Sequence, residues 1–300
     1  MTPFPRRTIT NPSVHSQSAI MDCKLSSDSK TAHCTFNDLS QFDQEKTGKL
    51  DPVGLLTVIR QAVESGWSMH DTFGLAASIS KDANLFLIAN CLDIYPLFYS
   101  NFSTQMPAQC DVSVVYVGRT SIVHEVSFKI KESGEVLATS LALAVFVNLE
   151  SRRPRPWPES FTNAYIEKTT VQKPSIHVQF ARLPPSDCKL YCHKTVVSSG
   201  DIDMNNHVGN PTYIKYCMDC ATFGARDKAY TLIKGDLADY PITCITYFFF
   251  NESLLHDELM VTSWEDRAKP FKLYFSIRTE EKDIMQCTFT FNVRHVGSNL

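Results

Sequence analysis

The chain carries one pattern of helix and strands twice, at an offset of 158 residues that lays Pro52 on Asn210 and Asp43 on Asp201. Apolar and small residues recur in both copies with the spacing of a helix buried along one face. They are Leu55, Val58, Ile59, Ala62, Val63 and Gly66 in the first copy, and Tyr213, Tyr216, Cys217, Cys220, Ala221 and Gly224 in the second. Each predicted helix ends at its glycine, the usual C-terminal stop. The sequence therefore predicts an internal repeat.

Runs rich in β-branched and aromatic residues follow each helix and are broken by short polar turns, which is typical of antiparallel strands. The runs are 112–117, 122–130 and 136–147 in the first half, and 245–250, 254–264, 271–278 and 284–293 in the second. One helix followed by a meander is thus predicted in each half. Six prolines between positions 154 and 185 predict an extended linker between the two units.

Composition narrows the classes of partner. The formal net charge is -3, which gives no basic field to follow a phosphate backbone, so nucleic acid is not expected as a partner. No stretch approaches the roughly 20 consecutive apolar residues that a membrane-spanning helix requires. The ten cysteines are scattered through a long chain without a secretory leader, and we expect reduced, mostly buried thiols.

The first residues differ in composition from the rest. Residues 1–31 are rich in Ser, Thr and Pro, carry Arg6 and Arg7, and hold no acidic residue before Asp22. This composition predicts a disordered tail, with an organelle-targeting segment as the alternative. We accordingly expect a cytoplasmic protein, or an imported one if the tail is a targeting segment.

Polar residues gather where the second helix begins. The stretch reads Asp201-Ile202-Asp203-Met204-Asn205-Asn206-His207-Val208-Gly209-Asn210, and Pro211 follows. Proline is favoured at the first position of a helix, so we predict that a helix starts here with Asn210 as its cap. The N–H groups and positive dipole of that helix end can stabilise a developing negative charge.

This stretch resembles the hotdog-fold acyl thioesterases, of the acyl-carrier-protein (ACP) and 4-hydroxybenzoyl-CoA types, in which D-x-D-x-N-x-H-V-N-N-x-x-Y precedes the central helix. The matching residues here are Asp201, Asp203, Asn205, His207, Val208, Asn210 and Tyr213, while Gly209 stands where the family usually carries Asn. Residues 118–121, 134–139 and 152–159 also look like the closing half of a hotdog thioesterase. The resemblance touches most of residues 33–160 and 187–293.

The resemblance implies an α+β fold of two tandem hotdog units. Each unit is an antiparallel sheet wrapped around a central helix, and the two units form a pseudo-dimer with the acyl site in the seam between them. The implied organisation is a disordered or targeting tail over 1–31, an N-terminal hotdog over 32–160, a linker over 161–186 and a motif-bearing C-terminal hotdog over 187–300. A homodimer of such double hotdogs is a further expectation.

The activity that the resemblance implies is hydrolysis of fatty or related acyl thioesters of ACP or coenzyme A, without cofactor or metal. This reaction needs a base or nucleophile, a held water and donors to the oxyanion. By the family pattern, Asp203 is the base or nucleophile, Asn205 holds water or carbonyl, and His207 orients or shares protons. The backbone N–H groups around Gly209 and Asn210 form the oxyanion site, and Tyr213 is a substrate contact. A fourth catalytic residue falls at Cys244 or Asp239.

Other interpretations of these residues remain open at this point. Asx residues ahead of a helix commonly cap it, and Cys244 can be an inward thiol at the start of a strand. Hotdogs also host hydratases and dehydratases, although here Asn-Pro follows the His rather than the Asp. A non-catalytic acyl-binding protein is the third class, since fold alone does not decide function.

The first copy lacks the motif. The aligned residues are Asp43, Glu45, Thr47, Gly48 and Lys49, with no Asn and with Lys in place of His. One working site per chain is therefore predicted, in the second half. The first copy would complete the seam, cover the acyl chain and contribute one polar residue such as Asp43 or Gln44.

Several further groups have two interpretations each. Arg119 and the run Arg152, Arg153 and Arg155 can meet the phosphates of coenzyme A or phosphopantetheine, or form an exposed basic rim. The stretch 247–250 is core or the lining of an acyl tunnel. Cys217 and Cys220 have CxxC spacing but lie on the buried stripe, which favours core packing. Cys188, Cys192 and His193 lack a fourth metal ligand, and His124-Glu125 is interpreted as a solvated or interface pair.

Overall fold

The computed structural model of the chain describes residues 21–28, 30–42, 44, 48–68, 83–166, 174, 176, 184, 188–203 and 207–292. Within them, eleven strands form one sheet in the order β1-β2-β4-β5-β6-β3-β8-β11-β10-β9-β7. The N-terminal elements are β1 (Met21–Leu25), β2 (Thr31–Phe36), α1 (Pro52–Ser68), β3 (Ala83–Ile94), α3 (Pro96–Ser100), β4 (Ala108–Val117), β5 (Ser121–Ile130), β6 (Val136–Asn148) and α4 (Glu159–Ile166). The C-terminal elements are β7 (Tyr191–Val196), η1 (Ser199–Asp201), α5 (Asn210–Arg226), η2 (Leu237–Asp239), β8 (Ile242–Phe249), β9 (Glu258–Glu265), β10 (Lys272–Arg278) and β11 (Asp283–Phe291).

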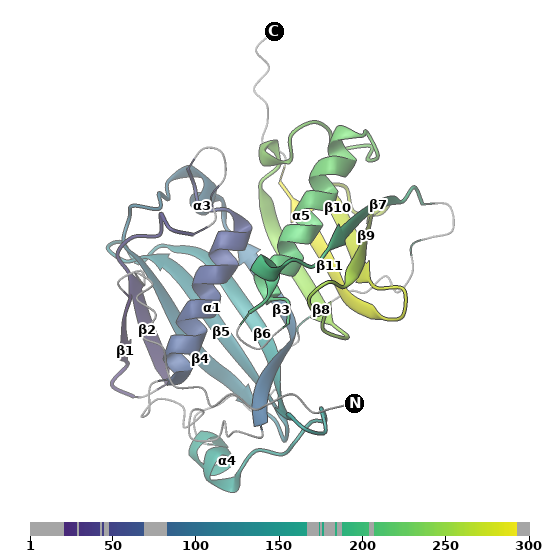
Figure 1. Cartoon of the computed structure of the whole chain (residues 1–300). Helices are drawn as coiled ribbons and strands as arrows, with labels where there is room; N and C mark the ends of the chain where they lie inside the picture. Colours follow the sequence, from purple (N-terminus) through teal and green to yellow (C-terminus); the bar gives the residue numbers. More distant parts are fainter. Residues whose placement is uncertain are drawn as a thin grey trace.

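The two halves of the sheet have the same topology. The order β2-β4-β5-β6-β3 in the N-terminal unit matches β7-β9-β10-β11-β8 in the C-terminal unit, and β3 pairs antiparallel with β8 to join them. The helices α1 and α5 lie on the same face of the sheet and contact each other across this seam (Figure 1). The predicted pseudo-dimer is therefore the observed arrangement.

The predicted internal repeat is confirmed. The helices Pro52–Ser68 and Asn210–Arg226 coincide at the offset found in the sequence. The isolated bridges Gln44↔Leu50 and Ile202↔Val208, which close a loop before each helix, coincide at the same offset. The repeat thus includes the loops that position the helix starts.

The predicted helix ends were wrong. The helix α1 continues past Gly66 to Ser68, and α5 continues past Gly224 to Arg226. A Cβ added at Gly224 would lie 2.5 Å from the Tyr230 hydroxyl oxygen, and one at Gly66 would lie 3.2 Å from Ala32 Cβ. These glycines serve close packing against a neighbouring segment, not helix termination.

Ordered structure extends into both segments predicted to lack it. The strand β1 pairs with β2 from Met21↔Phe36 to Leu25↔Ala32, inside the range 1–31 assigned to a tail, while residues 1–20 lie outside the described residues. The helix α4 occupies the start of the predicted linker. A series of aromatic ring contacts holds it there, with centroid distances of 4.4, 4.4 and 4.7 Å along Phe146, Trp157, Phe161 and Tyr165; the first two pairs are stacked and the third is tilted.

The ten cysteines are free thiols in this structure, and five of them are buried, which is half rather than the predicted majority. Cys217 and Cys220 lie on the buried face of α5, in the core.

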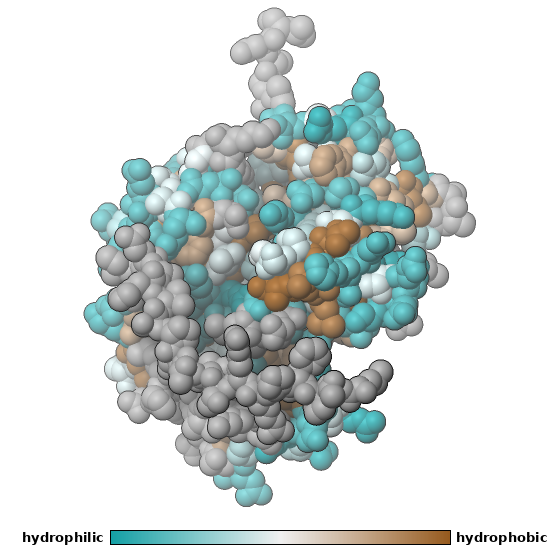
Figure 2. Space-filling view, in the orientation of Figure 1, coloured by the Kyte–Doolittle hydropathy of each residue, from teal (hydrophilic) through white to brown (hydrophobic). Residues whose placement is uncertain are grey.

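The C-terminal unit exposes large apolar side chains, among them Phe223, Leu254 and Leu255. Figure 2 shows apolar surface gathered on the side of the molecule where this unit lies. Among the described residues, none of the helices combines the length and apolar character needed to cross a membrane.

Candidate active site

A closed loop before α5 brings Asp203 and His207 together. The loop is fastened by the Ile202↔Val208 bridge and by the Asp203 N–H, which donates to the His207 carbonyl oxygen at 2.9 Å. Asp203 Oδ1 then lies 3.5 Å from His207 Nδ1, and the side chains are only 11% and 21% exposed. The predicted pairing of a carboxylate with an imidazole is thus present. Asn205 lies outside the described residues.

Asp201 has a structural task in this loop. Its Oδ2 accepts hydrogen bonds from the Ser198 N–H at 2.8 Å and from the Ser198 hydroxyl at 2.6 Å. This reciprocal bonding fixes the short helical turn η1 ahead of the loop. The two carboxylates of the motif therefore differ, since only Asp203 approaches His207.

The start of α5 differs in detail from the prediction. The N-cap residue is Gly209, without a side-chain cap, and Asn210 is the first helical residue. The Gly209 N–H donates to the Asp201 carbonyl oxygen at 3.2 Å, so it is already engaged. Within the described part of the chain, the Asn210 N–H has no hydrogen-bond partner, as expected for the first turn of a helix. Of the Gly209 and Asn210 N–H groups predicted to form the oxyanion site, the Asn210 N–H is therefore the one left to donate to an oxyanion.

The first unit supplies a cation that the sequence analysis missed. Arg60, on α1, places Nη2 3.3 Å from Asp203 Oδ2 and is held by Glu64, whose Oε1 lies 2.7 Å from Arg60 Nε. A Cβ at residue 209 would lie 3.1 Å from Arg60 Nη1. The glycine that departs from the family pattern therefore leaves room for this guanidinium. Of the polar residues expected from the first copy, Asp43 lies outside the described residues, and Gln44 donates to the Ser40 carbonyl oxygen.

Asp203 and His207 face a cavity of about 660 Å³ that crosses the seam. Its walls come from both units and are mainly aliphatic and aromatic. The apolar residues include Leu56, Ile59 and Val63 of α1, Leu85 and Leu87 of β3, Ala142 and Ala144 of β6, and Tyr247, Phe249 and Phe250 at the end of β8. The prediction that the stretch 247–250 can line an acyl tunnel is thus supported. A cavity of this shape and lining suits an apolar chain.

Tyr213 lines the cavity with its ring but uses its hydroxyl elsewhere. The side chain is buried, and its hydroxyl oxygen accepts a hydrogen bond from the Ser253 N–H at 2.8 Å. Burial raises the pKa of this phenol above its ordinary value. Tyr213 therefore forms part of the wall and anchors the segment after β8, whereas Asn210 lines the cavity at the helix start.

Basic side chains stand near Asp203 and His207. Arg152 lies over the Phe86 ring at 4.7 Å and pairs with Glu252, and Lys282 Nζ donates to the Glu252 carbonyl oxygen at 2.9 Å. All four residues line the cavity. Arg119 does not: it is exposed at the β4–β5 turn, where its carbonyl oxygen accepts from the Trp157 N–H at 3.1 Å. Of the arginines weighed from sequence, Arg152 is the one at the cavity.

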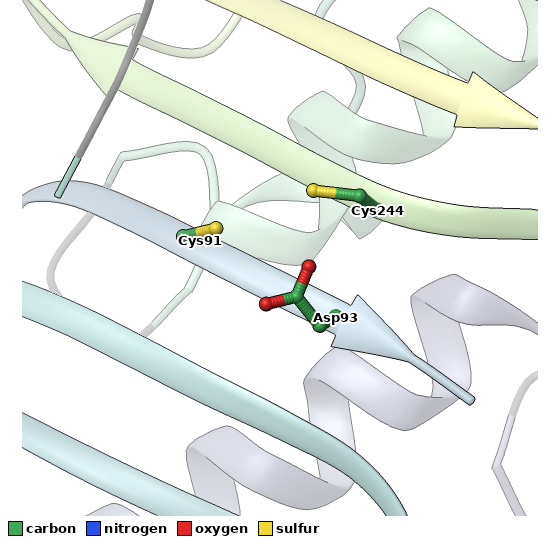
Figure 3. Close-up of side chains that lie close together, drawn as sticks. All are labelled: Cys91, Asp93 and Cys244. Atoms are coloured by element: carbon green, nitrogen blue, oxygen red, sulfur yellow. The ribbon is translucent and has the colours of Figure 1, made fainter.

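Cys244 is not part of this site. On β8, Tyr247 faces the helices and lines the cavity, so strand alternation turns Cys244 to the opposite face of the sheet. There it meets Cys91 and Asp93 of β3, with the ligand atoms of all three within 4.8 Å of one another (Figure 3). The prediction of a catalytic Cys244 is therefore wrong. Asp239, the other candidate, is exposed on η2 and does not line the cavity.

Five polar or polar-tipped side chains line the cavity away from the loop. We call Trp67, Asn90, His124, Ser140 and Tyr247 the polar group. The Asn90 amide donates to the Tyr247 hydroxyl at 3.0 Å and accepts from the Ser140 hydroxyl at 2.9 Å. The interpretation of His124 as a solvated or interface residue was wrong, because the residue is 5% exposed and its ring packs against Trp67 of α1.

Burial of His124 makes stability depend on pH. Desolvation lowers its pKa from the ordinary 6.5 to about 4. The unfolded chain gains a proton here below pH 6.5, whereas the folded ring stays neutral until about pH 4. The contribution is complete above pH 6.5 and is lost as the pH falls toward 4, by about 3 kcal/mol. Urea unfolding between pH 7 and 4.5 should show a shallower pH dependence in His124→Gln than in the wild type. The exposed control His256→Asn should follow the wild type; an unchanged slope in His124→Gln would contradict the expectation.

Comparison with known proteins bears on the fold. No family model and no curated protein matches the sequence. Among solved structures, a protein described as an oleoyl thioesterase of Lactobacillus plantarum has a TM-score of 0.68 at 15% identity, covering 90% of this chain and 99% of that one. An acyl-ACP thioesterase of Bacteroides thetaiotaomicron has a TM-score of 0.66 at 17% identity, covering 89% and 100%. The 12:0-ACP thioesterase of Umbellularia californica has a TM-score of 0.66 at 13% identity, covering 88% and 98%.

These likenesses agree with the sheet order and the two central helices in assigning an α+β double hotdog fold. The likeness extends over nearly the whole of each solved chain, so both units and their mutual arrangement are shared. The fold expected from the sequence is therefore confirmed.

Proposed function

We propose that this protein hydrolyses acyl thioesters of ACP or coenzyme A to a free acid and a thiol. The observation that carries the proposal is the position of Asp203 and His207, side by side on the wall of an apolar cavity that crosses the seam. A carboxylate beside an imidazole suits proton transfer, and the cavity suits an acyl chain. The acyl-ACP thioesterases with the same fold support this class of reaction.

The reaction would place the thioester carbonyl at the loop, with the acyl chain in the cavity. Asp203, as general base, takes a proton from water while the water oxygen attacks the carbonyl carbon; direct attack by the carboxylate, followed by hydrolysis of the anhydride, is the second route. The C–S bond then breaks, and the thiolate leaves and is protonated. The Asn210 N–H and the start of α5 stabilise the oxyanion. Arg60 holds the Asp203 carboxylate in place through its contact with Oδ2.

The carrier of the acyl group would lie outside the cavity. Arg152 and Lys282 line the cavity beside Phe86 and Glu252. Guanidinium and ammonium groups bind phosphate, which coenzyme A and phosphopantetheine both carry. Asn205 keeps its proposed role of holding water or carbonyl, and Cys244 has none.

Thiol release tests the proposed function directly. The full-length protein is incubated with acyl-CoA and acyl-ACP substrates of several chain lengths, while free thiol and enoyl absorbance are followed together. Thiol release with no change in enoyl absorbance supports hydrolysis. A change in enoyl absorbance without thiol release would replace the proposal by hydration, and tight binding with neither would make the protein a non-catalytic acyl binder.

Gly209 and Arg60 should act as one unit. In Gly209→Ala the added Cβ would lie 3.1 Å from Arg60 Nη1, so the guanidinium must shift by a few tenths of an ångström, and we expect this shift to weaken its contact with Asp203. We expect kcat/KM to fall by roughly tenfold in Gly209→Ala and in Arg60→Leu, which is about 1.4 kcal/mol of transition-state stabilisation. The double variant should lose no more than Arg60→Leu alone. Gly200→Ala is the matched control, since its Cβ would meet Ser198 Oγ at an ordinary 3.9 Å. Additive losses would contradict the coupling.

A further inference from the structure

Two cysteines and an aspartate meet where the two units join, on the outer face of the sheet, which is the face opposite to α1 and α5. Cys91 and Asp93 are on β3 and Cys244 is on β8, and their ligand atoms all lie within 4.8 Å of one another (Figure 3). Asp93 is exposed and neither cysteine is buried, so an ion can approach from solvent. Among the described residues, no other three His, Cys, Asp or Glu side chains bring their ligand atoms this close.

The register of the seam strands produces this cluster. Asp93 is directly opposite Cys244, and Cys91 is directly opposite Thr246. Residues two apart on a strand share a face, so these side chains all project from the outer face. Tyr247, the residue after Thr246, lines the cavity on the other face. The pairing that joins the two units therefore also brings the three ligands together.

The same register disfavours a disulfide between the two cysteines. Cys91 and Cys244 are diagonal neighbours, and diagonal Cα atoms in an antiparallel pair are about 7–8 Å apart. Disulfides usually require Cα atoms about 4.4–6.8 Å apart. A metal ion can bridge the longer separation, because it places two bonds of about 2.3 Å between the sulfur atoms.

The ligand set selects a thiophilic divalent ion. Two thiolates favour zinc over magnesium or calcium, and a carboxylate oxygen is also an ordinary zinc ligand. In a tetrahedral site with Zn–S bonds of about 2.3 Å, two sulfur atoms are about 3.8 Å apart. No pair in the cluster exceeds 4.8 Å, so closure on an ion requires movements of about 1 Å or less. Three protein ligands leave the fourth position of the tetrahedron to water.

We propose that Cys91, Asp93 and Cys244 bind one zinc ion, which fastens the N-terminal unit to the C-terminal unit on the outer face of the seam. Binding releases the thiol protons to solvent, since thiolates are the ligands. Two ligands come from one unit and the third from the other, so the ion adds a cross-link to the β3–β8 pairing. The inference does not depend on the proposed hydrolysis, because the sheet separates this cluster from the cavity.

Cobalt titration tests the site. The full-length protein is reduced with a phosphine, stripped of metal with a chelator and titrated with Co²⁺, whose absorption reports thiolate ligation and tetrahedral geometry. One equivalent should bind, Zn²⁺ should displace it, and Mg²⁺ should not. Cys91→Ser and Cys244→Ser should each remove about half of the thiolate charge-transfer absorption and weaken binding roughly a hundredfold or more, because even a residue that only hydrogen-bonds to a ligand contributes about 10–100-fold to metal affinity.

Two further variants make the assignment specific. Asp93→Asn should weaken Co²⁺ binding while both thiolates remain visible in the spectrum of the saturated protein. Cys192→Ser is the matched control, since this exposed cysteine on β7 lies outside the cluster, and it should bind like the wild type. Zn²⁺ should raise the Tm of the wild type, and this rise should be lost in Cys244→Ser. Circular dichroism verifies that each variant is folded.

Three results would overturn the inference. The first is a wild-type protein that binds no Co²⁺, and the second is binding that is unchanged in both Cys91→Ser and Cys244→Ser. The third comes from counting thiols in protein purified without reductant and denatured in chelator. A missing pair of thiols in the wild type, with none missing in Cys244→Ser, would make Cys91 and Cys244 a disulfide.

Discussion

Asp203→Asn should abolish most thiol release, with kcat reduced roughly a hundred- to ten-thousandfold, the usual contribution of a general acid or base. The amide has nearly the same shape, but it cannot take a proton from water or attack the carbonyl. Its neutrality also removes the partner of Arg60 Nη2, which lies 3.3 Å from Asp203 Oδ2. Single-turnover measurements with acyl-CoA isolate the chemical step from product release.

The matched control is Asp239→Asn. This exposed carboxylate on η2 was the alternative fourth residue from sequence, and it does not line the cavity. We expect its kcat to equal that of the wild type, and Cys244→Ser should likewise retain thiol release. A folded Asp203→Asn protein with wild-type kcat would refute the proposed mechanism.

Gly224→Ala should destabilise the chain by about 1–3 kcal/mol, the usual cost of an overpacked core. Alanine ordinarily strengthens a helix interior, so the sign depends on the neighbours. Here the new Cβ would lie 2.5 Å from the Tyr230 hydroxyl oxygen and 2.6 Å from its ring carbon Cζ. Tyr230 cannot easily move away, because its hydroxyl is 2.6 Å from Ser263 Oγ and the ring is buried.

A double-mutant cycle checks this explanation. Tyr230→Ala removes the ring, and in that background Gly224→Ala should cost nothing or should stabilise slightly through helix propensity. Thermal and urea unfolding of the four proteins give the coupling free energy. A loss of stability from Gly224→Ala that persists without the Tyr230 ring would show that another contact is responsible.

The fold could be predicted from the sequence because the repeat is visible in local patterns. Helical and strand periodicities are properties of neighbouring residues, and the offset between Pro52 and Asn210 required only comparison of the two copies. The pairing of Asp203 with His207 was also within reach, since one short loop holds both. The predicted helix cap was wrong by one residue. Gly209 has the extended backbone of an N-cap, but it has no side chain that would identify it as a cap in the sequence.

The missed residues depend on distant contacts. Arg60 meets Asp203 across 143 positions of sequence, and nothing near Arg60 predicts this partner. Cys244 was misassigned because a shift of one residue along a strand changes the face of the sheet. His124 was interpreted as polar surface or interface, since neither its burial on β5 nor its contact with Trp67 is visible in the local pattern.

The seam between β3 and β8 has a consequence for how this protein behaves on dilution. Two separate hotdog chains that share one site would dissociate as their concentration falls, and the ion pair across their interface would be lost. In this chain both halves are covalently joined, so each meets the other at a high effective concentration that does not depend on how much protein is present. The Arg60–Asp203 contact therefore persists in a single molecule, and the first copy can serve this one site without a motif of its own.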